Sequence, residues 1–230
     1  MWVVPREDLS EDQFEAVRQS TDRHRIVVGG PGSGKTLVLA HRTREILDDG
    51  ADPSRVRLLV YTNLLTKYLR AGVSDLGIPD GVADTFDRWC RKLHTELVGG
   101  AVPQGPNGRP DFARVRSDVL TVVRTEGGPP RFDAILVDEA QDLDETSLEL
   151  LCALSAHVTI AMDTRQQIYG TDMDLATAER VLGVPRAQGV LLTAYRCTQL
   201  IVDVASVFLP EEEAERFRRA NLMELEERQV

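Results

Sequence analysis

Long apolar runs are absent from this sequence of 230 residues, whose apolar pieces are short segments such as Ala134–Val137. A membrane-spanning helix needs about 18 or more consecutive apolar residues, so the sequence predicts no membrane span. The first residues, Met1–Asp8, also lack a basic region followed by an apolar stretch, so we expect no secretory signal peptide.

Cysteine is scarce as well. Cys90, Cys152 and Cys197 lie far apart, are odd in number and do not have the spacing of metal ligands. This pattern favours small buried hydrophobic side chains over disulfides or a metal centre. It predicts a reduced, cytoplasmic protein.

Basic residues are outnumbered: 27 Lys and Arg residues stand against 37 Asp and Glu residues, for a net charge of −10. The whole excess lies in residues 131–230, because residues 1–130 hold equal numbers of acidic and basic side chains. A general polyanion-binding protein shows a basic stripe instead. Any contact with nucleic acid is therefore expected at a local site.

What the sequence does contain is an alternation of short apolar segments with longer helical patterns, which is typical of a parallel sheet covered by helices on both faces. The expected strands are Arg25–Gly29, Arg57–Tyr61, Ala134–Asp138, Val158–Met162 and Val190–Leu192. The expected helices are Glu11–Gln19, Thr36–Leu47, Phe86–Leu97, Phe112–Thr125, Glu145–Leu154 and Gln199–Phe208. This order predicts a doubly wound, mainly parallel α/β fold of the RecA-like P-loop NTPase class.

Composition divides the chain into one domain and a tail. Residues 1–209 are expected to form the RecA-like domain, in which the Gly- and Pro-rich stretch Gly99–Pro110 opens a small helical insertion over residues 99–130. Residues 210–230 are rich in Glu and Arg, which predicts a solvated, acidic C-terminal helix or tail.

The most specific motif is a phosphate-binding loop. The run from Gly29 to Thr36 fits GxxxxGK[ST] and lies between a predicted strand and a predicted helix, the context that this motif needs. Lys35 would reach the β- and γ-phosphates of ATP, and the Thr36 hydroxyl would ligate Mg²⁺. A purely structural glycine-rich turn is the alternative, which the register of lysine and threonine disfavours. We therefore expect ATP to be bound by Gly30, Gly32, Ser33, Gly34, Lys35 and Thr36.

Two adjacent carboxylates supply a matching half of this site. Asp138 and Glu139 directly follow the apolar segment Ala134–Val137, at the carboxyl end of a predicted strand. Asp138 would hold the Mg²⁺, and Glu139 would accept a proton from the attacking water or orient it. Merely solvated carboxylates are the alternative. Together the two halves predict NTP hydrolysis.

With the run Asp138-Glu139-Ala140-Gln141-Asp142, the chain resembles superfamily 1 DNA helicases of the UvrD/Rep/PcrA type, and the resemblance extends from about Leu9 to about Phe208. Leu9–Gln13 is similar to the Q motif of that family, and Asp163–Tyr169 and Ala194–Arg196 are similar to its GDxxQxIY and NYR motifs. The resemblance implies that the adenine is bound by Gln13 and Tyr195, and that the γ-phosphate is contacted by Gln166 and Arg196. A guanidinium such as that of Arg196 suits the charge of a transferring phosphoryl group.

The same resemblance implies a path for single-stranded DNA. Val60–Asn63 is similar to the TFTN segment of the family and Asp84–Asp87 to its TFHS segment, which both line that path. An exposed aromatic side chain at Tyr61 would offer a base a stacking surface, whereas a core position is the alternative. The contacts are expected from Tyr61, Thr62, Asn63, Thr85, Phe86 and Tyr169.

Several positions depart from the family pattern. Asp87 replaces the histidine of TFHS, and Thr171 stands where the family usually has a base-stacking tryptophan. The insertion at residues 99–130 is much shorter than the accessory subdomain of UvrD-type enzymes. The residues after Phe208 are too few for a second RecA-like domain, so we expect the first motor domain alone, which needs a second one in cis or in trans.

The leading hypothesis is the N-terminal ATPase domain of a UvrD-like DNA helicase or translocase, which uses ATP and Mg²⁺ and moves 3′ to 5′ by resemblance. Its own affinity for single-stranded DNA is expected to be low and salt-sensitive. The alternative is a nucleotide-dependent regulatory or interaction module that switches a partner without strand translocation. Thr171 and the acidic Asp172 and Asp174 favour that alternative. A small-molecule kinase would leave the motif at Asp138–Asp142 unexplained.

Overall fold

The predicted parallel sheet is confirmed. The computed structural model describes residues 4–60, 73–163, 173–185 and 189–191, and everything below refers to these. They form a parallel sheet of six strands in the order β3-β2-β4-β5-β1-β6. The strands are β1 (Arg25–Gly29), β2 (Val56–Val60), β3 (Ala83–Thr85), β4 (Phe132–Val137), β5 (Ser155–Met162) and β6 (Gly189–Leu191).

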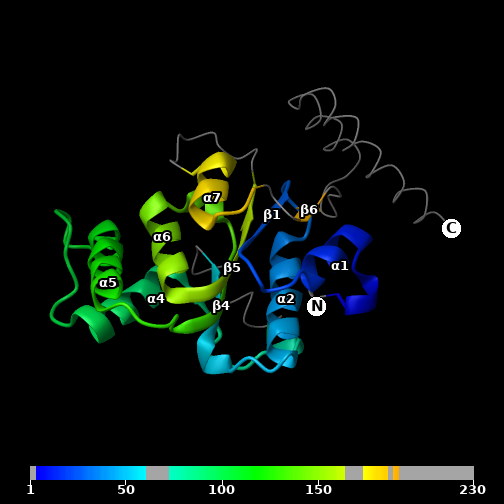
Figure 1. Ribbon diagram of the computed structural model, residues 1–230, viewed down its shortest axis with the longest axis horizontal. Helices are drawn as coiled ribbons and strands as arrows, with labels where there is room; N and C mark the ends of the chain where they lie inside the picture. The colour runs from blue at the N-terminus through cyan, green and yellow to red at the C-terminus, as the bar shows by residue number, and fades with distance from the viewer. Residues whose placement is uncertain (1–3, 61–72, 164–172, 186–188, 192–230) are drawn as a thin grey trace.

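Helices cover both faces of this sheet, as a doubly wound fold requires (Figure 1). Helices α1 and α2 pack on one face, and α4, α5, α6 and α7 form the layer on the other. Their bounds are α1 (Glu11–Arg18), α2 (Lys35–Asp48), α4 (Phe86–Leu93), α5 (Phe112–Glu126), α6 (Glu145–Leu154) and α7 (Leu175–Leu182). Short 3-10 turns lie at η1 (Arg6–Asp8), η2 (Pro53–Arg55) and η4 (Ala140–Asp142).

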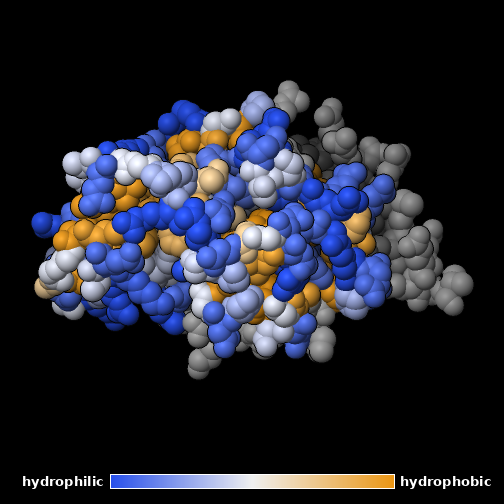
Figure 2. Space-filling view, turned by 60° about the horizontal axis from the view of Figure 1, so that its bottom comes forward, coloured by the Kyte–Doolittle hydropathy of each residue, from blue (hydrophilic) through white to orange (hydrophobic). Residues whose placement is uncertain are grey.

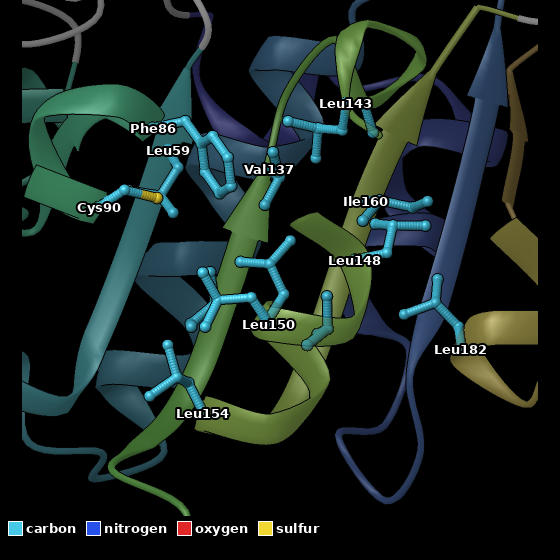
Figure 3. Packing of buried hydrophobic residues seen from close by; sticks show 14 of the residues in the cluster. Leu59, Phe86, Cys90, Val137, Leu143, Leu148, Leu150, Leu154, Ile160 and Leu182 are labelled. Atoms are coloured by element: carbon cyan, nitrogen blue, oxygen red, sulfur yellow. The ribbon is translucent and has the colours of Figure 1, made fainter. Parts of the chain in front are cut away.

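Each face of the sheet has its own hydrophobic core, because side chains alternate along a strand. On β4, Ile135 and Val137 face the layer of α4 to α7, whereas Ala134 and Leu136 face α2. Figure 3 shows the first core, in which leucines of α6 lie against the β4 and β5 side chains. Burial on both faces explains why this strand reads as a continuous apolar run.

Helix ends follow from local chemistry. A capping box is present at the start of α1, where the Ser10 hydroxyl accepts from the Gln13 N–H and the Gln13 side chain accepts from the Ser10 N–H. Helix α6 has its predicted bounds, because the Asp144 side chain accepts from the Ser147 N–H at the N-terminus.

Three elements differ from the sequence-based expectation. The helix predicted over Phe86–Leu97 is α4 followed by a π-helical turn, η3 (His94–Val98). Strand β3 and helix α7 were not predicted, because β3 has only three residues with an aspartate at its centre and α7 is only eight residues long. The predicted helix Gln199–Phe208 and the tail at residues 210–230 lie outside the described residues.

The predicted insertion is part of the helical layer. Helix α5 packs against α4, η3 and α6, and its Val115, Val119 and Leu120 belong to the same core as β4. The guanidinium of Arg116 on α5 lies 2.8 Å from the Asp144 carboxylate, at the start of α6. Within the described part of the chain, no helix is both long and apolar enough to cross a membrane.

The outer surface is mainly polar. Figure 2 shows one face on which hydrophilic side chains surround smaller hydrophobic areas. Among the described residues, the large hydrophobic side chains classed as exposed are those of Val4, Val98 and Val190.

Candidate nucleotide-binding and hydrolysis site

The phosphate-binding loop joins β1 to α2, as the sequence predicts. Gly32 and Gly34 have φ angles of 80° and 86°, in the left-handed region that glycine adopts without strain. At Gly34 a Cβ atom would lie only 2.4 Å from Gln13 Nε2. The left-handed conformation therefore favours glycine at the last residue before α2, and a side chain there would also displace the Gln13 amide.

Lys35 lies over this loop and is almost fully buried, with 6% of its surface exposed. Its ammonium group donates to the carbonyl oxygens of Gly29 at 2.9 Å and of Gly30 at 3.2 Å. The positive charge is thus held inside the turn of the loop, next to the N-terminus of α2. A helix N-terminus and a buried ammonium group together favour an anion at this position.

Gln13 ties α1 to the loop. Its Nε2 donates to the Ser33 carbonyl at 2.9 Å, and its Oε1 accepts from the Ser10 N–H at 3.2 Å. The side chain is buried, so both ends of the amide are used inside the protein. These contacts assign Gln13 a role in positioning the loop, and the predicted contact with adenine stays a prediction.

The two predicted halves of the site meet at Thr36 and Asp138, 102 positions apart in the sequence. The Thr36 hydroxyl donates to Asp138 Oδ2 at 2.5 Å. Asp138 follows the end of β4, and its N–H donates to the Leu59 carbonyl at 2.9 Å, which holds the residue beside β2. The residues predicted to ligate the metal therefore lie side by side.

The Asp138 carboxyl is 1% exposed, and this burial raises its pKa to about 6. The neighbouring Glu139 carboxylate raises the pKa further, whereas the Thr36 hydrogen bond and the Lys35 charge oppose the shift. A hydroxyl and a carboxylate are the hard oxygen ligands that Mg²⁺ prefers. A bound divalent cation would also favour the ionised carboxylate. The residues present thus fit a magnesium ion.

Glu139 has an unusual backbone. Its φ of 52° and ψ of 46° make it the one non-glycine residue with positive φ in the described part of the chain. This conformation costs about 1–2 kcal/mol, and such strain occurs most often at functional sites. The Glu139 side chain is half-buried, and its Oε2 accepts from Gln141 Nε2 on η4 at 2.7 Å.

Gln141 completes this part of the site, although no role was predicted for it. It is 3% exposed, and its Oε1 accepts from the Asp163 N–H at 3.0 Å. Asp163 directly follows β5, so Gln141 bridges the ends of two neighbouring strands. Its place in the run Asp138–Asp142 was visible, but its partners depend on the sheet order.

Two residues that were predicted to contact DNA are buried, and their contact with DNA stays a prediction. Phe86 is 1% exposed and packs in the core, with its ring 6.0 Å from that of Trp89. Thr85 is also buried, and its hydroxyl accepts from the Arg88 N–H at the start of α4. The cause is the amphipathic pattern of α4, which turns its first apolar residue inward. As placed, neither side chain presents a surface to a nucleic acid.

Asp87, which replaces the family histidine, faces the insertion instead. Its Oδ1 lies 3.7 Å from Arg116 Nη1, and the same guanidinium contacts Asp144. Burial raises the pKa of Asp87, and the charge of Arg116 opposes that shift. The remaining predicted site residues lie outside the described residues: Tyr61, Thr62, Asn63, Gln166, Tyr169, Tyr195 and Arg196.

Comparison with known proteins agrees with this geometry. The family model of the AAA domain matches residues 13–172, which is more than half of the chain. The chain belongs to this family. The match includes the phosphate-binding loop and the run Asp138–Asp142.

Curated relatives point to DNA helicases. The chain is 36% identical over 70 residues to the ATP-dependent DNA helicase PcrA of Staphylococcus epidermidis, a match of 30% of this chain and 10% of that protein. It is 31% identical over 91 residues to PcrA of Leuconostoc citreum, and 29% identical over 90 residues to a probable DNA helicase II homolog of Mycoplasma capricolum. Those matches cover 39% and 37% of this chain, and 12% of each relative.

A solved structure supports the same fold. The Pif1 helicase from Candida albicans aligns with a TM-score of 0.50 and 15% sequence identity, over 92% of this chain and 47% of that one. This likeness shows the fold alone. The family match, together with the PcrA matches, confirms the predicted membership among superfamily 1 helicase RecA-like domains, and the chain spans only a part of the length of these proteins.

Proposed function

We propose that this chain is the ATP-binding and ATP-hydrolysing motor domain of a DNA helicase or translocase. The contact between Thr36 and Asp138 carries the proposal, because it joins the phosphate-binding loop to a buried carboxylate at the end of β4. That pairing is what a Mg²⁺–nucleotide site needs. The family match and the PcrA relatives, named as ATP-dependent DNA helicases, favour a motor over a regulatory module.

Each residue then has a role in hydrolysis. The loop N–H groups and Lys35 would bind the phosphates, and Thr36 and Asp138 would hold Mg²⁺, which would neutralise negative charge on the phosphates. Glu139 orients the attacking water and accepts its proton. From segments outside the described residues, Gln166 and Arg196 would contact the γ-phosphate.

The DNA side of the proposal rests on the relatives. We infer that single-stranded DNA is contacted by Tyr61, Thr62, Asn63 and Tyr169, with translocation 3′ to 5′ and a second RecA-like domain supplied in cis or in trans. The net charge of −10 predicts weak and strongly salt-dependent binding by this chain alone. The expected cytoplasmic location belongs to the same proposal.

ATPase measurements with and without single-stranded DNA test this function. Wild type should hydrolyse ATP slowly and faster with DNA, Lys35→Ala should lose nucleotide binding or turnover, and Glu139→Gln should bind ATP without turnover. Lys92→Ala is the matched control, because Lys92 is exposed and pairs with Asp84 on β3. Hydrolysis by Lys35→Ala at the wild-type rate would refute the site. ATP turnover with no DNA binding or stimulation, even at low salt, would favour the regulatory module.

A further inference from the structure

Gln141 lies between two groups that belong to different strands. Its Nε2 donates to Glu139 Oε2 at 2.7 Å, and its Oε1 accepts from the Asp163 N–H at 3.0 Å. The side chain is 3% exposed, so water competes little for either contact. One buried amide thus connects the end of β4 to the end of β5.

The orientation of this amide is fixed by chemistry. A backbone N–H can only donate, so the atom that faces Asp163 must be the carbonyl oxygen of Gln141. The NH₂ group therefore faces Glu139 and requires an acceptor there, which an ionised carboxylate supplies. Reversing the amide would place donor against donor at Asp163 and acceptor against acceptor at Glu139.

Glu139 depends on this contact more than an ordinary surface carboxylate does. Its left-handed backbone, with φ of 52°, carries the side chain back over η4 towards Gln141. A charge-assisted hydrogen bond is short and directional, and it holds the carboxylate in one orientation. Removal of the donor would leave the side chain free to rotate about its own torsions.

We propose that Gln141 is the positioning residue for Glu139 and that it links this carboxylate to the end of β5. The proposal rests on the function proposed above, in which Glu139 orients the attacking water. From Asp163 the chain continues into residues 164–172, which lie outside the described residues and include the predicted γ-phosphate contact Gln166. A shift of this strand end on nucleotide binding would be transmitted to Glu139 through one side chain.

A double-mutant cycle in thermal denaturation tests the contact without any need for activity. Gln141→Glu keeps the bond to Asp163 but places a carboxylate against Glu139, so its melting temperature should fall by roughly 2–4 °C. Combination with Glu139→Gln restores a donor and an acceptor, now exchanged between the two positions, and should return most of that loss. Additive effects of the two substitutions would overturn the contact. Gln104→Glu is the matched control, since Gln104 is exposed on a loop and should not change the melting temperature.

Steady-state ATPase kinetics test the positioning role. Gln141→Glu should lower kcat about tenfold or more, because misplacement of a reacting group mainly affects the transition state, while KM for ATP stays within about twofold of wild type. Gln104→Glu should keep both constants. The proposal would be overturned if Gln141→Glu kept the wild-type kcat. It would also be overturned if the loss of kcat were fully explained by the fraction of the variant that is unfolded. If wild type itself does not hydrolyse ATP, the proposed function fails and the kinetic role of Gln141 fails with it, whereas the denaturation cycle still decides whether the contact exists.

Discussion

Replacement of Arg42 by methionine should destabilise the protein and loosen the nucleotide site at the same time. Arg42 lies on α2, is 1% exposed and donates to the carbonyl oxygens of Val17 at 3.0 Å and Gln19 at 2.5 Å. Its Nε donates to Thr159 Oγ1 at 2.9 Å on β5. These carbonyls are at the C-terminal end of α1, where the helix itself supplies no donors. One guanidinium therefore fastens α1 to α2 and to the sheet.

The size of the effect follows from two opposing terms. The three hydrogen bonds that Arg42 donates to Val17, Gln19 and Thr159 each stabilise the folded state by roughly 1.5–3 kcal/mol, because their donor is charged. Burial of the guanidinium opposes them and lowers the pKa of Arg42 to about 10, a shift that corresponds to about 3 kcal/mol of charge desolvation. Methionine would fill much of the same space, but it would make none of these hydrogen bonds and would carry no charge to desolvate. We expect a net loss of about 3 kcal/mol in the free energy of unfolding.

Urea denaturation followed by tryptophan fluorescence measures this loss, with the buried Trp89 in the core as a reporter. Arg44→Met is the control on the same helix, because Arg44 is partly exposed and pairs with Asp48 at the surface. Its substitution should cost under about 1 kcal/mol. Equal stability of the two variants would show that the buried guanidinium does not fasten α1.

A binding measurement connects the same substitution to function. Helix α1 carries Gln13, whose amide holds the Ser33 carbonyl of the phosphate-binding loop. A loosened α1 should therefore weaken ATP binding by Arg42→Met several-fold at a temperature where the variant is still folded. Calorimetric titration of both variants with ATP would reveal this. An unchanged affinity for ATP in a destabilised Arg42→Met variant would show that the packing of α1 does not control the phosphate-binding loop.

Two further substitutions probe the loop and the buried histidine. Gly34→Ala should lower the affinity for ATP at least about tenfold and the free energy of unfolding by about 1–2 kcal/mol. The left-handed backbone at this position disfavours a side chain, and the new Cβ would meet Gln13. Titration calorimetry measures the change in affinity, and urea denaturation measures the change in stability. His157 has a pKa lowered to about 3 by burial, so the folded protein keeps it neutral and stability is lost as the pH falls below about 6.5. Between pH 7 and pH 5 the contribution of His157 to this loss should be about 2 kcal/mol, so His157→Gln should lose about 2 kcal/mol less than wild type, as compared by urea denaturation at both pH values.

The parts of the fold that the sequence predicted well depend on local patterns. Strand β1 and helix α6 have their predicted bounds, because a strand buried on both faces reads as an apolar run and α6 begins at a capping aspartate. The phosphate-binding loop was predictable for a similar reason, since its glycines meet a conformational requirement that is independent of the rest of the chain. The relation of this loop to Asp138 also followed from a rule, because both come after parallel strands.

The parts that were missed depend on partners distant in the sequence. Strand β3 has Asp84 at its centre, which reads as a turn residue until its ion pairs with Lys92 at 2.7 Å and Arg88 at 3.3 Å on α4 are known. Phe86 matched a family segment that lines a DNA path, yet packing of α4 on the sheet buries it. Gln141 belongs to the motif Asp138–Asp142, but its contacts with Glu139 and Asp163 become apparent only when β4 and β5 are known to be neighbouring strands.

The affinity of the site for a nucleotide depends on the difference between the free energy of the new contacts and that of the internal hydrogen bonds they replace. Lys35 already bonds to the loop carbonyls, and Thr36 bonds to Asp138. An incoming phosphate and its metal must replace each of these internal bonds, so every new contact is offset by one that is lost, and the net gain per bond is small. Charge does not cancel in the same way, because Asp138 is buried beside the Glu139 carboxylate and a divalent cation would relieve that repulsion. Binding of nucleotide without a divalent cation should therefore be far weaker than binding of the pair, because the metal relieves a cost that the folded chain already carries.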